Sequence, residues 1–174
     1  LIQHEANARG KNGKITLVVC NTVQRACETF DAVKKKSGDV SVELVHSRFR
    51  PAERERWRDE FLSRKRCEAD TNRIIVATQV VEAGVDISAG CLITELAPWP
   101  SLVQRFGRCA RYGGSGSVFV VDRGRDEKTA PPYSVEQLES AWEALQGLSG
   151  VGLATLEAFE ESLNESQRTQ LYPY

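Results

Sequence analysis

Residues 14–21 read KITLVVCN, a short apolar run that is rich in β-branched side chains. Such a run is typical of a strand that is buried on both faces of a sheet. The next stretch, VQRACETFDAVKKK at 23–36, repeats apolar residues at helical spacing, and either Asn21 or Thr22 is placed to cap that helix. A buried strand that leads directly into a helix indicates an α/β protein.

Further apolar runs repeat this pattern along the chain. We expect strands at 40–46, 73–78, 91–96 and 116–122. We expect helices at 51–66, where Pro51 opens the first turn, and at 101–111. Strands of nearly continuous Val, Ile and Leu that alternate with helices predict a parallel sheet with helices on both faces. Ligands bind beyond the carboxyl ends of the strands in such sheets, where we expect Asn21, Thr22, residues 46–48 and Thr78.

The last part of the chain has a different composition. Residues 122–132, DRGRDEKTAPP, are typical of a linker. An amphipathic helix is predicted over 133–148, and a glycine cluster then separates it from one last short helix. We therefore predict a domain over 1–130 and a C-terminal helical extension over 131–174, which begins a linker or an accessory region.

Composition excludes several classes of protein. With 41% hydrophobic and 27% charged residues, the 174-residue chain is neither disordered nor membrane-embedded, and its net charge of −1 argues against binding nucleic acid by bulk charge alone. The five cysteines form no C-x-x-C pair, which suggests reduced, buried thiols in a cytoplasmic protein. Methionine is absent, even at position 1, so we expect a piece of a longer polypeptide.

Two stretches carry possible binding chemistry at the ends of predicted strands. In ATQVVEAGVDIS (77–88), Gly84 would supply a positive φ or a close backbone approach to a ligand, and Asp86 could accept hydrogen bonds from a ribose. The alternative is an ordinary turn with a capping aspartate. VHSRFRP (45–51) places two arginines and a serine before a helix, which suits a phosphate, although a solvated loop is the alternative.

A third stretch, QRFGRCAR at 104–111, concentrates positive charge. On a continuous helix Gln104, Arg108 and Arg111 would share one stripe, with Arg105 to the side. Acids are not interleaved here to relieve the repulsion, so phosphate is the natural counter-ion, and ion pairing with acids elsewhere is the alternative. The only histidines are His4 and His46, without clustered Cys or Asp partners, so no metal site is predicted.

Taken together, these stretches resemble a known family. Q-R-x-G-R-x-x-R, following A-T-Q-x-x-E-A-G-x-D-I, is similar to motifs VI and V of superfamily 2 helicases. NTVQRA, LVHSRF, ATQVVEAGVDIS and APWPSLVQRFGRCAR more specifically resemble the second RecA-like motor domain of the CRISPR-associated helicase–nuclease of type I systems. The resemblance covers about residues 14–122, and the 131–146 helix matches the segment that follows the motor in this family.

The resemblance implies a RecA-like fold and a role for each motif residue. It implies that Arg108 and Arg111 are arginine fingers that reach the ATP γ-phosphate, that Gln104 lies beside the nucleotide, and that Gly84 and Asp86 lie near the γ-phosphate and the ribose. It implies that Arg105 holds motif V against motif VI. The residues that it places along the phosphates of single-stranded DNA are Asn21, Thr22, Ser47, Arg48, Thr78 and Gln79.

Other parts of a motor have no match in this sequence. No G-x-x-x-x-G-K-[ST] loop, D-E-x-[DH] motif or nuclease His-Asp residues occur. The resemblance therefore implies half of an ATP-dependent helicase, in which ATP and Mg²⁺ are held mainly by a first RecA-like domain, and this piece alone is inactive. The implied partners are single-stranded DNA, that first domain, a nuclease domain of the same polypeptide and a CRISPR guide-RNA surveillance complex, with no membrane.

Three alternatives stay open at the level of sequence. The motif Q-R-x-G-R is shared widely, so the chain could belong to another superfamily 2 motor, such as an RNA helicase or a DNA-repair translocase. It could be a nucleic-acid-binding module without enzymatic activity. A kinase or nucleotide transferase on a similar sheet is the least supported, because no stretch here could cradle phosphates.

Overall fold

The computed structural model describes residues 15–48, 62 and 72–173. The helix expected at 51–66 lies outside these residues except for Leu62. In chain order the described elements are β1 (Ile15–Val19), α2 (Val23–Lys34), β2 (Ser41–Val45), β3 (Arg73–Ala77), the 3-10 helix η2 (Gln79–Val81), β4 (Cys91–Glu95), α5 (Trp99–Phe106), β5 (Ser117–Val121), α6 (Val135–Gln146), α7 (Leu153–Ser162) and α8 (Glu165–Leu171).

The described strands form one five-stranded sheet in the order β2-β3-β1-β4-β5. Every pair of neighbours is parallel, and Leu17 in the central strand β1 lies between Ile75 of β3 and Leu92 of β4. The five expected strands and their parallel arrangement are therefore confirmed.

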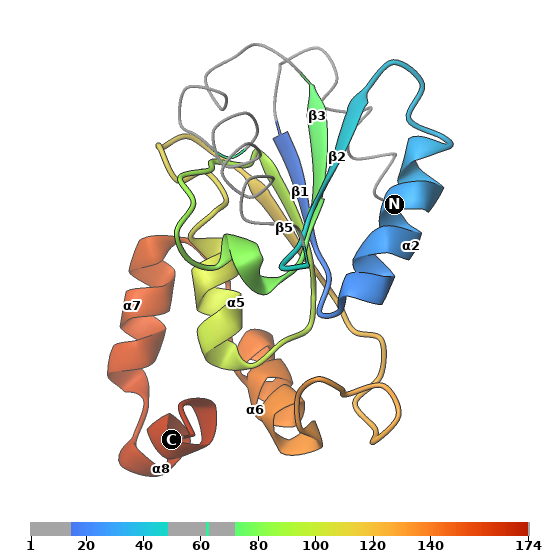
Figure 1. The fold of residues 1–174 in the computed structure, drawn as a ribbon. Helices are drawn as coiled ribbons and strands as arrows, with labels where there is room; N and C mark the ends of the chain where they lie inside the picture. Colours follow the sequence, from blue (N-terminus) through green and yellow to red (C-terminus); the bar gives the residue numbers. More distant parts are fainter. Residues whose placement is uncertain (1–14, 49–61, 63–71, 174) are drawn as a thin grey trace.

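Side chains that alternate along β1 build a separate core on each face of the sheet. Leu17 and Val19 belong to the larger core, which includes Leu102 of α5, whereas Val18 and Cys20 pack in a smaller core with Ala26 of α2. Figure 1 shows α2 on one face and α5 and α7 on the other. The prediction of helices on both faces is confirmed.

Helix α2 is capped by one of the two predicted residues. Thr22 has an extended backbone, and its Oγ1 accepts a hydrogen bond of 3.2 Å from the Arg25 N–H. The side chain of Asn21 instead faces the interior, where it is 6% exposed. Thr22 is therefore the N-cap of α2.

The helix expected at 101–111 is shorter than predicted and ends at Phe106. Gly107 is its C-cap, and the chain then turns through Ala110, whose φ is +50°. The turn is fixed because the Ala110 N–H donates to the Ala89 carbonyl at 2.8 Å and the Ala89 N–H donates to the Arg108 carbonyl at 2.7 Å. The expectation that Gln104, Arg108 and Arg111 share a helical stripe is wrong.

The C-terminal extension is helical, with two helices after α6 where one was predicted. Leu138, Leu156 and Leu171, one from each of its helices, belong to the same buried core as β1. The extension therefore packs on the larger core of the sheet, and the boundary at residue 130 stays a prediction. Among the described helices, none has the length and apolar character that crossing a membrane requires.

Candidate functional site

Glu82 joins the loop after β3 to α5 and to the turn that follows α5. Its Oε1 accepts a hydrogen bond from Arg105 Nε at 2.9 Å, and its Oε2 accepts one from Ser101 Oγ at 3.1 Å. Its backbone carbonyl accepts a third from Arg108 Nη2 at 2.6 Å. One residue of the 77–88 motif therefore holds three residues of the 101–108 segment.

Arg105 is the centre of a buried polar network. Its side chain is 0% exposed, and such a charge is stable only when it is paired and hydrogen-bonded, which the carboxylate of Glu82 provides. Its other acceptors are Asn21 Oδ1 at 3.0 Å, Thr94 Oγ1 at 2.8 Å, the Glu95 carbonyl at 3.1 Å and Tyr133 Oη at 3.3 Å. Arg105 thus joins the two motifs, as the resemblance implies.

Arg108 is also buried, but it is held by carbonyl groups rather than by an acid. It is 7% exposed, with Nη1 donating to the Val85 carbonyl at 2.9 Å and Nη2 to that of Glu82. Burial, and then the neighbouring charge of Arg111, lower the pKa of Arg108 from its usual value. Its Nε has no hydrogen-bond partner among the described residues.

Arg111 and Asp86 form an ion pair at the surface. Arg111 Nε lies 3.1 Å from Asp86 Oδ1, and the two side chains are 43% and 52% exposed. Because exposed pairs of this kind contribute only about 0–1 kcal/mol, either partner can exchange the other for a ligand at little cost. Gly84 nearby in sequence has the expected positive φ, +71°, and nothing within 4 Å of where a Cβ would stand.

The residues for which the resemblance implies a place near the nucleotide do not lie at the carboxyl ends of the strands. Residues 89 and 109 form a parallel bridge, and the following Gly90 donates to the carbonyl of Ile15, the first residue of β1. The turn that carries Arg108 and Arg111 therefore lies at the amino ends of the strands. Gln104 is exposed one turn earlier, on α5.

The predicted DNA-binding residues form a second group, at the carboxyl ends of β1, β2 and β3, which are neighbours in the sheet. Ser47 and Arg48 are exposed, and Thr22 and Gln79 are half-buried. Asn21 and Thr78 are buried, and both ends of the Asn21 amide are engaged, by Arg105 and by the Leu96 carbonyl at 2.7 Å. Of the predicted DNA-binding residues, solvent therefore reaches Ser47, Arg48, Thr22 and Gln79.

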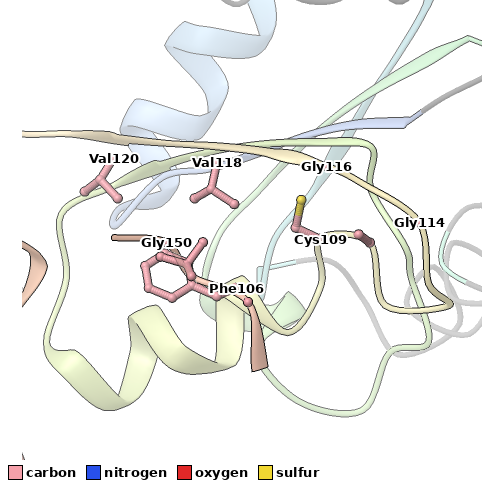
Figure 2. A pocket seen from close by; sticks show the side chains of 10 residues that line it. Phe106, Cys109, Gly114, Gly116, Val118, Val120 and Gly150 are labelled. Atoms are coloured by element: carbon pink, nitrogen blue, oxygen red, sulfur yellow. The ribbon is translucent and has the colours of Figure 1, made fainter. Parts of the chain in front are cut away.

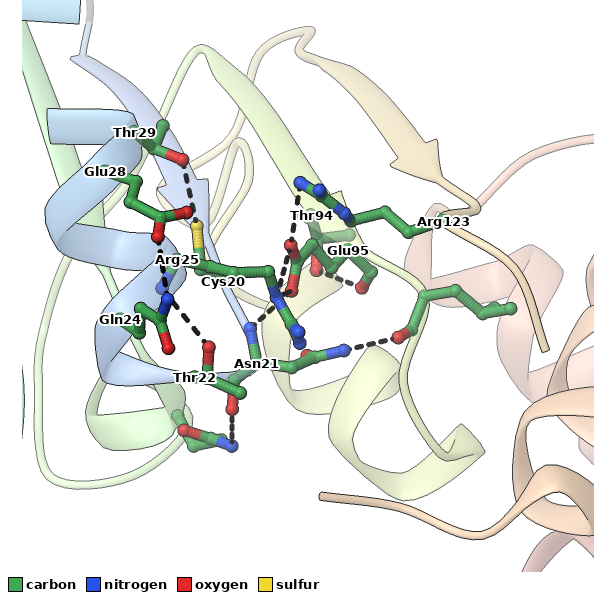
Figure 3. Close-up of polar contacts among 12 residues, drawn as sticks. Cys20, Asn21, Thr22, Gln24, Arg25, Glu28, Thr29, Thr94, Glu95 and Arg123 are labelled. Carbon is green, nitrogen blue, oxygen red and sulfur yellow. Dashed lines mark hydrogen bonds and ion pairs between the residues drawn. The ribbon is translucent and has the colours of Figure 1, made fainter. Parts of the chain in front are cut away.

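Glu95 supports this edge of the sheet and was not singled out from the sequence. Its carboxylate accepts the Asn21 N–H at 2.6 Å and lies 2.9 Å from Arg25 Nε and 3.7 Å from Arg123 Nη1 (Figure 3). Beside it, the pKa of the Cys20 thiol is raised to about 11, mainly by burial and secondly by the negative charge of Glu95. An acid at the end of the apolar run CLITEL was the available signal.

A hollow of about 440 Å³ beside β5 is a poor candidate for this site. It is lined by Phe106, Val118 and Val120 together with Cys109 and several glycines (Figure 2). Because no charged side chain lines it, the hollow offers little to hold a phosphate. Nor do the described residues include a cluster of three or more His, Cys, Asp or Glu side chains that could bind a metal ion.

Comparison with known proteins gives the family of this arrangement. The family model for the C-terminal region of the CRISPR-associated nuclease/helicase Cas3 matches residues 12–114. The CRISPR-associated helicase Cas3 of Thermoproteus tenax is 30% identical over 158 residues, which cover 88% of this chain and 26% of that protein. The chain thus spans about a quarter of this relative.

Solved structures give the fold. The crystal structure of T. fusca Cas3-ATP matches 98% of this chain and 22% of that chain, with a TM-score of 0.77 and 21% identity. A chain in a structure of a CRISPR RNA-guided surveillance complex, pre-nicking, matches 90% of this chain and 22% of that chain, with a TM-score of 0.61 and 18% identity. The expected RecA-like fold is confirmed, and the chain belongs to the family of the CRISPR-associated nuclease/helicase Cas3, as part of its C-terminal region.

Proposed function

We propose that this chain is the second motor domain of an ATP-dependent single-stranded DNA translocase that acts in CRISPR defence. The observation that carries the proposal is the set of hydrogen bonds at Glu82, which hold Arg105 and Arg108 in place. Arg111 and Asp86, close by, stay exposed to solvent. A guide-RNA surveillance complex and a nuclease domain of the same polypeptide are the proposed partners. They are supported by the family and by the surveillance-complex structure with the same fold.

On the nucleotide side, the residues present suit a phosphate that is held mainly by another domain. Arg111 would leave Asp86 for the γ-phosphate, Asp86 would then face the ribose, and Gln104 would lie nearby. Arg108 offers an Nε without a described partner, but its other nitrogens already bind carbonyl groups of the loop. Bound ATP with Mg²⁺ supplies the phosphoryl group, and guanidinium groups stabilise the charge on it during transfer.

The test of this assignment is ATP hydrolysis by the full-length protein with saturating single-stranded DNA. Arg111→Ala and Arg108→Ala should each lower the rate by on the order of 10³–10⁵, as expected for arginine fingers, while DNA binding stays largely intact. Arg111→Lys should not restore the rate, because an ammonium group cannot present two donors in a plane. The isolated chain should not hydrolyse ATP.

The two arginines should differ in their effect on stability. Arg108→Ala removes hydrogen bonds to two loop carbonyls and should lower the melting temperature, whereas Arg111→Ala removes only an exposed pair and should leave it unchanged. Lys128→Ala, which removes an exposed cation between β5 and α6, is the control for both measurements. Nearly normal turnover in both site variants would remove the arginine-finger assignment, and turnover by the isolated chain would overturn the half-motor proposal.

On the DNA side, we propose sequence-independent contacts between strand phosphates and the carboxyl edge of the sheet. Arg48 is an exposed cation just after β2, with Ser47, Thr22 and Gln79 as uncharged donors. Asn21 and Thr78 would then act mainly by supporting that edge. Few phosphate contacts and a net charge of −1 predict weak, salt-sensitive binding by the isolated chain.

Arg48→Ala should weaken the binding of oligo-dT by the isolated chain. It should also reduce the slope of log Kd against log salt concentration by about 1, the effect of losing one phosphate contact. The control is Lys35→Ala, which removes an exposed cation at the C-terminal end of α2. Fluorescence anisotropy over a salt series measures both effects. Equal losses in the two variants would mean that Arg48 contributes only general charge, and tight binding at high salt would contradict the half-motor proposal.

A further inference from the structure

We propose that Tyr133, in the C-terminal extension, is a positioning residue that couples the DNA side of the motor to its nucleotide side. The inference rests on the proposed function and names a residue outside the motifs that carry it. Tyr133 immediately precedes Ser134, the N-cap of α6, and its N–H donates to the Ala130 carbonyl at 3.1 Å. Its backbone is thus fixed at the start of the extension.

The hydroxyl group of Tyr133 is shared by two donors that come from different sides of the site. Gln79 Nε2 donates to it at 3.2 Å, and Arg105 Nη2 donates to it at 3.3 Å. A phenol oxygen accepts through its lone pairs, so these two donors use its accepting capacity together. A movement of either donor changes the geometry that is available to the other.

Asn21 closes this arrangement into a ring. Gln79 Nε2 also donates to the Asn21 carbonyl at 2.8 Å, and Arg105 Nη1 donates to Asn21 Oδ1 at 3.0 Å. The four residues come from the loop after β1, the start of η2, α5 and the extension. Tyr133 is the member through which the extension joins the ring.

The ring connects the two separated groups of site residues. Gln79 belongs to the proposed DNA side, and Arg105 binds the carboxylate of Glu82, whose carbonyl in turn holds Arg108. A strand that displaces the Gln79 amide would therefore disturb Arg105 and, one step further, the carbonyl that orients an arginine finger. Hydrogen-bond networks of this kind transmit changes when they have two arrangements that both ligands bias.

Coupling can be measured at equilibrium, because two linked ligands change each other's affinity by the same factor. In the full-length protein, the Kd of a labelled oligo-dT is measured with and without the non-hydrolysable analogue AMPPNP. DNA stimulation of ATP hydrolysis is measured in parallel. Tyr133→Phe, which removes only the hydroxyl, should reduce the AMPPNP-dependent factor in Kd by about fivefold or more. DNA stimulation should fall with it.

The control is Tyr172→Phe, which removes another partly buried hydroxyl of the extension, one that bonds Glu160 instead. It should change neither quantity, whatever it does to the melting temperature. Gln79→Ala removes the shared hydrogen bond from the other side, together with the bond to Asn21, so its combination with Tyr133→Phe should reduce the factor by less than the product of the two separate reductions. This double variant keeps the test decisive if Tyr133→Phe also lowers stability.

The outcomes separate the two proposals. If the unaltered protein shows neither a nucleotide effect on DNA affinity nor DNA-stimulated hydrolysis, the proposed function is wrong, and the coupling falls with it. If the unaltered protein shows both and Tyr133→Phe retains them in full, the coupling role of Tyr133 alone is overturned. An equal loss in Tyr172→Phe would also overturn it, because it would show a general effect of loosening the extension.

Discussion

Arg105, Arg108 and Arg111 are three residues apart in sequence, and each lies in a different environment. Arg105 is enclosed and bonded to a carboxylate, Arg108 is buried against carbonyls, and Arg111 is exposed beside Asp86. The difference follows from Gly107, where the helix stops, so the last two arginines lie on a turn instead of a stripe. Three identical side chains thus have three different roles: Arg105 links segments of the structure, Arg108 is partly held by carbonyls, and Arg111 is an exposed donor in an ion pair.

Gly116 permits a close approach between two segments at the amino end of β5. A Cβ built there would lie 2.5 Å from Cys109 Sγ and 3.3 Å from the Gly90 carbonyl oxygen. Gly116→Ala should lower the free energy of unfolding by about 1–3 kcal/mol, because the Cys109 thiol has to move and the Gly90 carbonyl has to give way slightly. Urea unfolding of the isolated chain measures this.

The matched control is Gly150→Ala, in the lining of the same hollow. A Cβ at Gly150 would meet nothing within 4 Å. Its stability should be unchanged or slightly higher, since alanine restricts the unfolded chain. Similar losses in both variants would show that the contact with Cys109 does not limit this position.

At the scale of the element, α6 begins at a well-formed cap. Ser134 Oγ accepts a hydrogen bond from the Gln137 N–H at 3.2 Å, and Gln137 Oε1 accepts one from the Ser134 N–H at 3.1 Å. The two bonds form a capping box at the start of α6. Ser134→Ala should destabilise the isolated chain by about 1 kcal/mol, because it leaves an N–H of the first turn without its acceptor. Thermal unfolding monitored by circular dichroism measures the loss.

Ser140→Ala, within the same helix, serves as the control for the cap. The Ser140 hydroxyl bonds a carbonyl one turn back, and alanine has the higher helix propensity, so stability should hold or rise. If the two substitutions have the same effect, the capping box does not stabilise α6.

The elements differ in how well local sequence predicts them. The five strands were predictable because each is a short apolar run, and a strand buried on both faces needs little else. The end of α5 was not, because Gly107 can continue a helix at modest cost, and hydrogen bonds between residues 89 and 110 decide where it stops. Contacts such as Arg105 with Tyr133 join distant segments, so no local pattern contains them.

At the scale of the whole molecule, the sheet and the extension share one core. Leu17 of β1 and Leu138, Leu156 and Leu171 of the extension belong to the same buried cluster. We therefore expect the isolated chain to unfold in one cooperative transition, seen at the same temperature by circular dichroism and by tryptophan fluorescence. A chain that ends at residue 130 should melt at a lower temperature. A separate, earlier transition of the extension or a broad non-cooperative profile would contradict this expectation.

The central position of β1 has a consequence for how the protein is made. Its neighbours in the sheet are β3 and β4, so neither partner exists when β1 leaves the ribosome. At about 5–20 residues per second, the chain from Val19 to Ala77 takes roughly 3–12 s to synthesise. During that interval β1, in which Thr16 is the one polar residue, has both edges unpaired, so we expect the nascent chain to bind chaperones before the sheet forms.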